Sequence, residues 1–496
     1  MDQAASPPAD EPAEASQLPS VSDIDPKGDV ILDVVFETSK DTLKLARKEA
    51  KFSRTPVTEN LKPRTRFAYR VQINILRKQS KYFDSLLGNT QFQEARIVTD
   101  KLSKLSLANV KPAEADPSEL PWVRIEDDDE ATRVAGRNRV LADLLRILHG
   151  KDIATKPVNM SFVTTLAVLA DRFDCAATVS RCLSTKLKFK WPATHQAKTP
   201  RTEEGGRLSE AAEGLLRQKV LTAWLLDQPP RMATATRELL IRGSRQWSLF
   251  NAPETDDKPI WWDLQDDLEN ELRSRRECIM NTMSSILRHF LTLYTSRGTQ
   301  QCKLGYDSSA ACDSYQLGEM IRFFTNKNLL HLTDFGPASA YNIPDSCQLN
   351  VEEMIATLRQ FPGYQIDNHH TNCGLRIRLM PILEYIQTML SASAVAISST
   401  AWKKERKTTA WSDEVNEFED DRHDGDDGKQ KTFKFTRSVA GDQRLRYEGA
   451  MAAEKMAREL FTAEDWDWTP DDNVSSSSSF PGEFRPLGFK QDRTRR

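Results

Sequence analysis

The spacing of the apolar residues changes at Gln72, and this change constrains the fold more than any other feature of the sequence. Before it, residues 29–36 form a β-branched apolar run, and residues 66–71 are a second short strand candidate. After it, apolar residues recur every three or four positions, as one buried helical stripe requires: Ile75, Leu76, Tyr82, Phe83, Leu86 and Leu87. The pattern predicts two short helices that meet near Ser80.

Further elements complete a compact α+β unit over residues 28–190. Residues 122–125 are expected to form a strand, and residues 140–148, 162–173 and 175–189 are expected to form helices. Two polar stretches are interpreted as loops or inserts: residues 99–119, and a basic insert at residues 44–64 with seven basic and two acidic residues. The basic insert is typical of a solvated loop or short helix, and the alternative is a patch for an anionic partner.

Five segments of this unit occur in the order of a known domain. They are Gly28-Asp29-Val30, residues 71–83 with Leu86-Leu87, Phe92-Gln93-Glu94, residues 144–150 (LLRILHG) and residues 166–175 (LAVLADRFDC). Together they resemble the BTB/POZ domain in the divergent form found in filamentous fungi. The resemblance covers about a third of the chain. It implies a short-stranded sheet flanked by helices and a role in binding other proteins. Gln72 stands where the family usually has His.

The resemblance also implies candidate partner-binding residues. BTB adaptors that engage cullins carry a hydrophobic residue, any residue and then Glu after the paired helices, and Phe92 and Glu94 stand at the matching places. Tyr82 and Phe83 complete the candidate set. A large aromatic anchor of this kind contributes about 2 kcal/mol or more to binding when it fills a pocket. We expect a non-enzymatic adaptor for a cullin-based ubiquitin ligase or, alternatively, a BTB scaffold in transcriptional regulation. Self-association is expected to be a weak dimer or absent.

The remainder of the chain is predicted to be mainly helical. A linker at residues 191–215 precedes a helical domain at residues 216–407, with helices expected near residues 221–226, 233–241, 262–295, 315–324, 351–361 and 375–390. The helix at 262–295 carries one long apolar stripe: Leu264, Leu268, Leu272, Ile279, Met283, Leu287, Phe290 and Tyr294. Asp313 is expected to cap the helix that follows it, and Pro381 to kink or break the last one.

The ends of the chain are polar. Residues 1–27 and 471–496 are interpreted as disordered tails, residues 408–440 as an acidic flexible segment and residues 441–470 as a helix. The net charge of −3 excludes a globally basic surface for nucleic acid, and no recognisable DNA-binding module is present. Seven cysteines in 496 residues are too sparse for a disulfide scaffold. No secretory signal or apolar run of membrane-spanning length is found, so we expect a cytoplasmic or nuclear protein without membrane contact.

Signatures of common catalytic sites are missing from the sequence. It contains no G-x-S-x-G, P-loop, H-E-x-x-H or G-x-G-x-x-G pattern, so no catalytic residue and no cofactor is assigned. Two alternatives stay open. Cys373 with His369 or His370 has the residue types of a nucleophile and its base. Cys302, Cys312, His370 and Cys373 have the residue types of tetrahedral zinc, although Cys302 and Cys312 are nine residues apart rather than two to four. The competing interpretation is that these cysteines are small buried core residues.

Overall fold

The computed structural model divides the chain into two compact units. The first comprises residues 1–190 with residues 256–260, and the second comprises residues 191–255 and 261–496. The structure describes residues 19–52, 61–194, 208–248, 264, 268–296, 300–302, 304–330, 349–370, 373–391, 395–397 and 399–404. The predicted acidic segment at 408–440, helix at 441–470 and tail at 471–496 lie outside the described residues. Each unit is described separately below.

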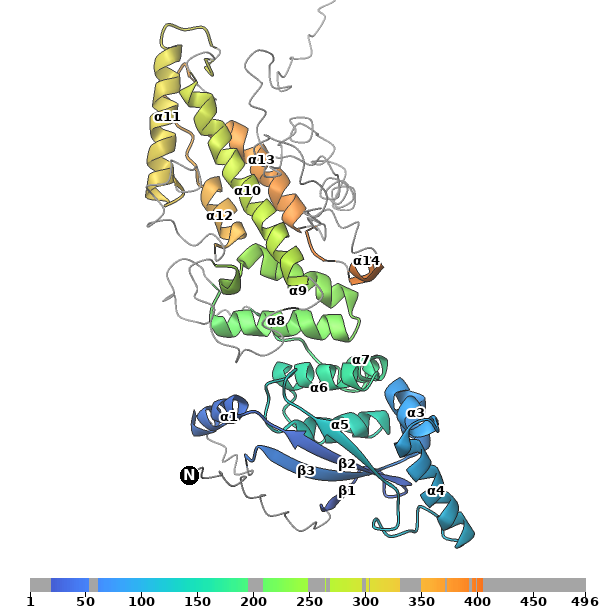
Figure 1. The fold of residues 1–496 in the computed structure, drawn as a ribbon. Coiled ribbons are helices and arrows are strands. Elements are labelled where there is room, and N and C mark those ends of the chain that lie inside the picture. The colour runs from blue at the N-terminus through green and yellow to red at the C-terminus, as the bar shows by residue number, and fades with distance from the viewer. Residues whose placement is uncertain are drawn as a thin grey trace, which may run out of the picture. The chain divides into compact units, whose positions relative to one another are not determined.

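A four-stranded sheet organises the first unit (Figure 1). Its strands are β1 (Val21–Asp23), β2 (Val30–Glu37), β3 (Arg64–Val71) and β4 (Trp122–Asp127), in the spatial order β1-β3-β2-β4. β2 pairs antiparallel with β3 and parallel with β4, and β1 pairs parallel with β3. The three strands predicted from the sequence are confirmed. β1 is a correction, because it lies within the predicted tail at residues 1–27 and joins that part of the tail to the sheet.

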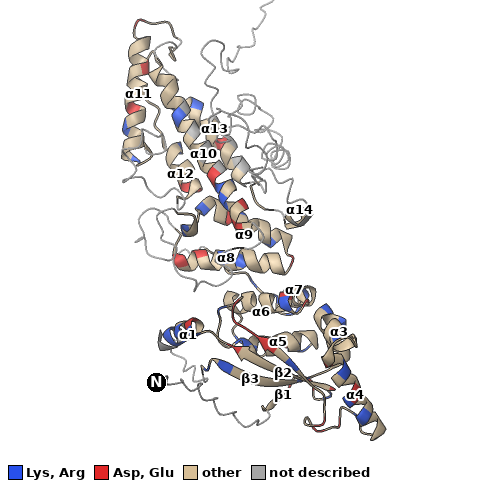
Figure 2. Ribbon diagram, viewed as in Figure 1, with Lys and Arg blue, Asp and Glu red and all other residues tan. Residues whose placement is uncertain are grey.

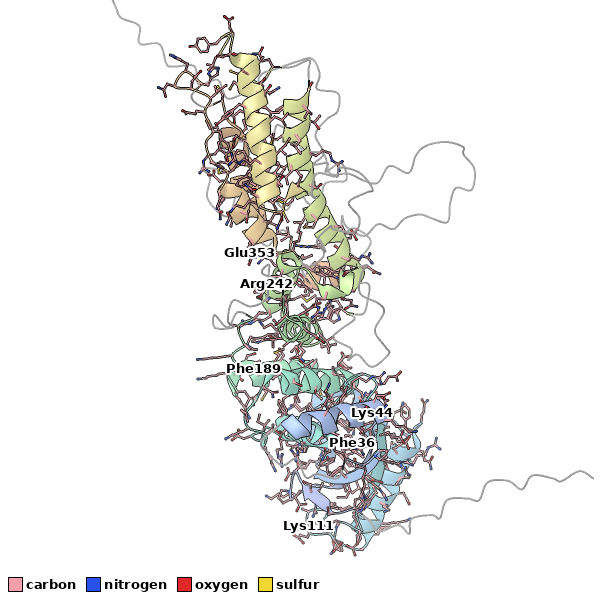
Figure 3. The ribbon with its side chains drawn as sticks, turned by 90° about the vertical axis from the view of Figure 1, so that its left-hand side faces the viewer. Phe36, Lys44, Lys111, Phe189, Arg242 and Glu353 are labelled. Atoms are coloured by element: carbon pink, nitrogen blue, oxygen red, sulfur yellow. The ribbon has the colours of Figure 1, made fainter. Side chains whose placement is uncertain are left out.

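Both faces of this sheet are covered, which explains why β2 is apolar along almost its whole length. On one face, Ile31 and Ala68 pack with Leu105, Ala115 and Leu120 from the segment that precedes β4. On the other face, the hydroxyl of Tyr69 donates a hydrogen bond to the backbone carbonyl of Asn138 in helix α5 (Arg137–Leu148). A strand buried on both faces cannot alternate polar and apolar residues. Side chains fill the first unit around Phe36 (Figure 3).

The two short helices meet at Ser80, as the sequence predicted. Ser80 ends α2 (Ile73–Gln79) and is the N-cap of α3 (Lys81–Gly88). Its hydroxyl accepts a hydrogen bond from the backbone N–H of Phe83 and donates one to the carbonyl of Phe173. The buried side chain of Ser80 therefore caps the start of α3 and links it to the residue that follows helix α6 (Met160–Arg172).

The loop predicted at residues 99–119 is wrong over residues 99–107, which belong to helix α4 (Gln93–Leu107), whereas residues 108–119 form no helix or strand. Ala95, Val98, Leu102 and Leu105 follow one another at intervals of three and four, which is a helical stripe in an otherwise polar segment. α1 (Lys40–Phe52) begins before the basic insert and covers its first residues, which agrees with the short helix predicted as one form of the insert, and its blue positions are visible in Figure 2. α5 (Arg137–Leu148), α6 (Met160–Arg172) and α7 (Ala176–Thr185) match the three remaining predicted helices.

The second unit consists of helices in its described residues. They are α8 (Glu210–Leu225), α9 (Pro229–Arg242), the short 3-10 helix η1 (Arg245–Trp247), α10 (Leu268–Thr295), α11 (Ser309–Asn326), α12 (Val351–Arg359), α13 (Leu375–Ser391) and α14 (Ser399–Lys404). All eight residues of the predicted stripe at 262–295 are buried. α8 begins within the linker predicted at 191–215, so that linker is shorter than expected. α13 continues through Pro381 without a break.

Asp313 does not cap a helix, contrary to the prediction. It lies inside α11, and its carboxylate accepts hydrogen bonds from the backbone N–H groups of Gln301 at 2.7 Å and Cys302 at 2.8 Å. The carboxylate of Asp313 therefore stabilises the backbone of the preceding loop rather than the start of the helix. This contact places Cys302 beside α11, where it becomes part of the cluster described below.

Candidate functional site

The first candidate site is an exposed surface formed by α3 and α4. It comprises Tyr82, Phe92, Glu94, Ile97 and Leu107, and is called the α3–α4 surface from here on. Its four apolar side chains are among the large hydrophobic residues that remain exposed, with Phe92 at 44% and Leu107 at 87%. Single exposed hydrophobic residues are normal on a protein, whereas contiguous apolar patches mark interaction sites. α3 and α4, which carry these residues, pack against each other, so this surface is a candidate contact for a partner.

Aromatic stacking holds Tyr82 in place. The ring of Phe83 stacks on Phe173 with centroids 5.4 Å apart and planes at 9°, and the ring of Tyr82 meets both edge-on at 5.3 Å. Phe83 is 1% exposed. A partner can reach Tyr82 but not Phe83 in this conformation, so Phe83 supports the surface from beneath.

A tight turn presents Phe92 and Glu94. The backbone N–H of Phe92 donates to the carbonyl of Asn89 at 3.0 Å, and Phe92 is the N-cap residue of α4 with its ring left half exposed. Glu94 lies in the first turn of α4, where the helix dipole favours a carboxylate. Burial raises the pKa of the Tyr82 hydroxyl, and the negative charge of Glu94 raises it further, which shows that the two side chains lie near each other.

The segments that carry the family resemblance support one another around the start of α2. The backbone N–H of Gln72 donates to Nε2 of His149 at 3.0 Å, and that of Ile73 donates to Oδ1 of Asp29 at 2.8 Å. Nδ1 of His149 lies 2.7 Å from the carbonyl of Leu145, which assigns the ring proton to Nδ1. Burial, the largest effect, lowers the pKa of His149, so the imidazole is neutral at pH 7.

The second candidate site is a group of three thiols in the second unit. Cys302 lies before α11, Cys312 within α11 and Cys373 just before α13, yet their sulfur atoms all lie within 4.8 Å of one another. The Sγ atoms of Cys302 and Cys373 are 3.8 Å apart. The structure thus brings together three of the four residues that the sequence proposed for zinc.

His370, the fourth of those residues, lies nearby but outside the thiol group. It is completely buried, its Nδ1 lies 2.8 Å from Oδ1 of Asp367, and its Nε2 lies 3.3 Å from the hydroxyl of Ser308. The next residue, Ser309, accepts a hydrogen bond from the thiol of Cys302 at 3.4 Å. His369 is exposed and packs edge-on against Tyr306.

The three thiols differ in how readily they ionise. Burial opposes the thiolate of Cys302, but its hydrogen bonds with Ser309, the backbone N–H of Leu304 and the neighbouring thiols lower its pKa overall. Burial, followed by the charge on Cys302, raises the pKa of Cys312 to about 12. Burial and the contact with Cys302 raise that of Cys373 to about 11. A raised pKa is unfavourable for a nucleophile, which weakens the Cys373–His pair as a catalytic hypothesis.

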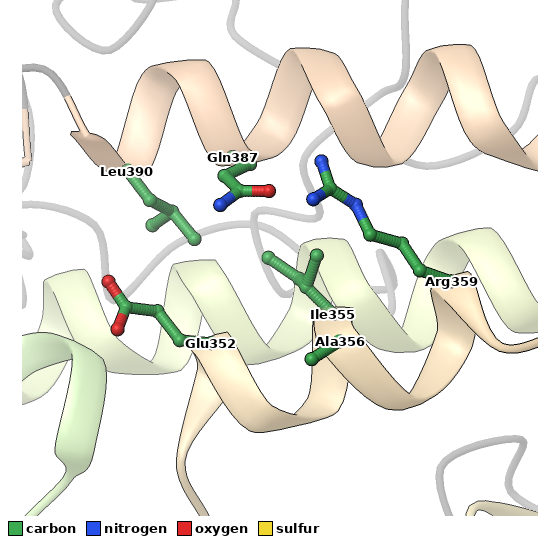
Figure 4. A pocket seen from close by; sticks show the side chains of 6 residues that line it. All are labelled: Glu352, Ile355, Ala356, Arg359, Gln387 and Leu390. Carbon is green, nitrogen blue, oxygen red and sulfur yellow. The ribbon is translucent and has the colours of Figure 1, made fainter.

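A small cavity lies between α12 and α13 (Figure 4). Its volume is about 50 Å³, and it is lined by Glu352, Ile355, Ala356, Arg359, Gln387 and Leu390. This volume suits a water molecule rather than a substrate, because ligand pockets are typically about 300 Å³ or larger. The cavity therefore offers no small-molecule site.

No family model, curated protein or solved structure matches the chain. Within the described residues, every helix is too short or too polar to cross a membrane. The function must therefore be argued from the two sites themselves.

Proposed function

We propose that residues 28–190 form a BTB/POZ-type module that binds other proteins. The observation that carries the proposal is the contact set around α2 and α3. Asp29 and His149 satisfy the first backbone N–H groups near the start of α2, and Ser80 joins α3 to Phe173. Residues from four of the five resembling segments take part in this set, which supports the proposal because the segments that carry the resemblance agree with the fold.

The α3–α4 surface is the proposed contact with a cullin. Phe92 and Glu94 stand where the family's adaptors place their hydrophobic and acidic residues, and both side chains are at least partly accessible. An aromatic anchor with a neighbouring carboxylate combines buried apolar area with an orienting hydrogen-bond acceptor. The proposal includes a client protein bound elsewhere on the chain and a location in the cytoplasm or nucleus.

The test is a pull-down of a fungal cullin with the full chain and with Phe92→Ala and Glu94→Lys. Each variant is expected to weaken retention at least about tenfold, because loss of a contact worth about 1.4 kcal/mol changes an equilibrium constant tenfold. Leu45→Ala is the matched apolar control, because Leu45 on α1 is also 44% exposed and lies away from α3 and α4 (Figure 1). Glu119→Lys is the charge-reversal control at an exposed position.

Both controls are expected to retain the cullin as the unaltered chain does, with unchanged circular dichroism. Failure of the unaltered chain to retain any cullin would remove the adaptor function and leave the BTB scaffold in transcriptional regulation. Equal losses in the variants and their controls would show that the α3–α4 surface is not the contact.

A further inference from the structure

We propose that Cys302, Cys312 and Cys373 bind a zinc ion, with His370 as the fourth ligand. This centre lies in the second unit and goes beyond the proposed protein-binding role of the first. Three sulfurs and one imidazole form a ligand set that structural zinc prefers. The three cysteines come from separate segments, so an ion bound to them would join the loop before α11, α11 itself and the start of α13.

The sulfur separation fits metal coordination. Two sulfurs that each lie about 2.3 Å from one tetrahedral zinc ion are about 3.8 Å apart. The Sγ atoms of Cys302 and Cys373 are 3.8 Å apart, and all three sulfurs lie within 4.8 Å. A disulfide would require a separation of about 2.0 Å. Small side-chain adjustments would bring the third sulfur to the same spacing.

The burial pattern of the two loops turns metal-ligating side chains inward. Among the described residues at 300–308, Cys302 is the only buried one, while Leu304 and Tyr306 are exposed. In the described part of the loop between α12 and α13, Phe361, His370 and Gly374 are buried, and Phe361 packs on Phe323 and Tyr364. Apolar packing therefore accounts for Phe361, whereas Cys302 and His370 are buried side chains of metal-ligating types.

Polar contacts fix the loop that carries Cys302. Asp313 accepts hydrogen bonds from the backbone of Gln301 and Cys302, which holds the loop against α11. Arg378 of α13 donates to the side-chain oxygen of Gln301 at 2.8 Å and to its backbone carbonyl at 3.1 Å. Tyr294 donates through its hydroxyl to the carbonyl of Cys373 at 3.3 Å. The sulfurs are therefore held together by their surroundings, as a pre-organised site requires.

His370 has the hydrogen bonding of a zinc ligand. Its Nδ1 proton faces the carboxylate of Asp367, which leaves the lone pair on Nε2 available. Carboxylate–histidine pairs of this kind orient imidazole ligands in metal sites. Nε2 now contacts the hydroxyl of Ser308, next to the residue that touches Cys302. Coordination by Nε2 would replace this hydroxyl contact and would bring the His370 ring to the three sulfurs, a group that it lies outside in the present arrangement.

The test begins with the metal content of the full chain, purified under reducing conditions without chelator. Elemental analysis is expected to give about one zinc per chain. Replacement of the zinc by cobalt(II) is expected to produce thiolate-to-cobalt charge transfer in the near ultraviolet and intense ligand-field bands in the visible, which report tetrahedral sulfur coordination. Both measurements use the unaltered protein, so they do not depend on any variant folding.

Variants then assign the ligands. Cys312→Ser is expected to reduce bound zinc at least about tenfold. The control is Cys182→Ser, which replaces a buried thiol of the first unit and is expected to retain the zinc. His370→Ala is expected to change the cobalt ligand-field bands, and Asp367→Asn to weaken affinity about 10- to 100-fold. An unchanged spectrum for His370→Ala would remove His370 from the site. Metal-free protein that gives no cobalt spectrum, or a Cys302–Cys373 disulfide in the native chain, would overturn the proposal.

Discussion

Arg217 lies at the centre of a buried ionic network in the second unit, and its replacement gives the sharpest test of how that unit is held together. Its guanidinium is fully buried and donates to Glu213 on its own helix and, through two nitrogens, to the carboxylate of Glu269 on α10 at 2.8 and 2.9 Å. It also donates to the hydroxyl of Ser244 at 2.6 Å, and Trp247 donates through its indole N–H to Glu269 at 2.6 Å. The network therefore connects α8, η1 and α10.

Arg217→Met removes the only arginine that these contacts place between the two carboxylates. The side chain of Glu213 is fully buried and that of Glu269 is 12% exposed. The methionine variant therefore leaves these two carboxylates largely shielded from water and without the guanidinium between them. Removal of one partner of a buried ion pair costs about 3 to 5 kcal/mol. In a folded domain of about 150 to 250 residues, a range that includes the helical domain predicted at residues 216–407, each kcal/mol lowers the melting temperature by about 2 to 4 °C. The expected decrease is therefore about 6 to 20 °C.

Differential scanning calorimetry of the full chain measures this effect, because the two units are expected to unfold in separate transitions. Arg273→Met is the control, since Arg273 pairs with Glu277 on the exposed side of α10, where such pairs contribute about 0 to 1 kcal/mol. Only the transition of the second unit should move. A melting temperature for Arg217→Met within about 2 °C of the control would refute the reasoning, because it would mean that the buried pair contributes no more than a surface pair.

The remaining predictions concern the first unit. Ser80→Ala removes the cap of α3 and leaves the carbonyl of Phe173 without its hydroxyl donor. Urea denaturation is expected to show a free energy of unfolding lower by about 2 to 3 kcal/mol, and almost no change for the control Ser85→Ala at an exposed position. Burial lowers the pKa of His149, so the unfolded chain binds a proton more readily and the first unit should lose stability as the pH falls below about 6.5. Thermal melts of the unaltered chain and His149→Gln between about pH 7.5 and 5.5 test this, and equal slopes would contradict it.

The elements that depend on local periodicity could be predicted from the sequence. The double-sided burial of β2, the helix pair at Ser80 and the stripe of α10 all follow from residue spacing. α4 was missed because its exposed face is so polar that the stripe of Ala95, Val98 and Leu105 was outweighed by composition. β1 was missed because its three residues, of which only Val21 is apolar, pair as an edge strand only once β3 is in place. Tertiary contact, rather than propensity, decides such short elements.

The residues of the candidate sites also differ in whether local sequence patterns could predict them. Phe92 and Glu94 are proposed from the order of motifs. Ile97 is exposed on a helix that the sequence did not predict, and Leu107 lies on the part of it where the sequence predicts a loop. The cysteine group was proposed from residue type alone, and its spacing of nine residues counted against it. The structure removes that objection, because Asp313 holds Cys302 beside α11 through backbone hydrogen bonds that no spacing rule contains. Spacing rules apply to ligands that share one local turn, not to ligands gathered by tertiary contacts.

Buried arginines show why charge in the sequence was a poor guide to the interior. Charged residues make up 28% of the chain, yet Arg70, Arg137 and Arg276 are all buried and donate to backbone carbonyls. The accepting carbonyls belong to Gly28, Glu37, Pro112, Ala113, Ala115, Asp127, Val134, Leu240, Ile241 and Leu349.

These contacts supply hydrogen bonds to backbone carbonyls of irregular segments and helix ends, which have no partner in regular secondary structure. Arg276 donates to the carbonyls of Leu240 and Ile241, which are among the last four of α9 and have no partner within the helix. A planar guanidinium with five donors can satisfy several such carbonyls at once, which lysine cannot do. Because arginine stays charged across the accessible pH range, these connections persist when carboxylates and imidazoles titrate. The pH sensitivity of the first unit must therefore arise from groups such as His149, whose pKa burial lowers, rather than from the arginines that hold the segments together.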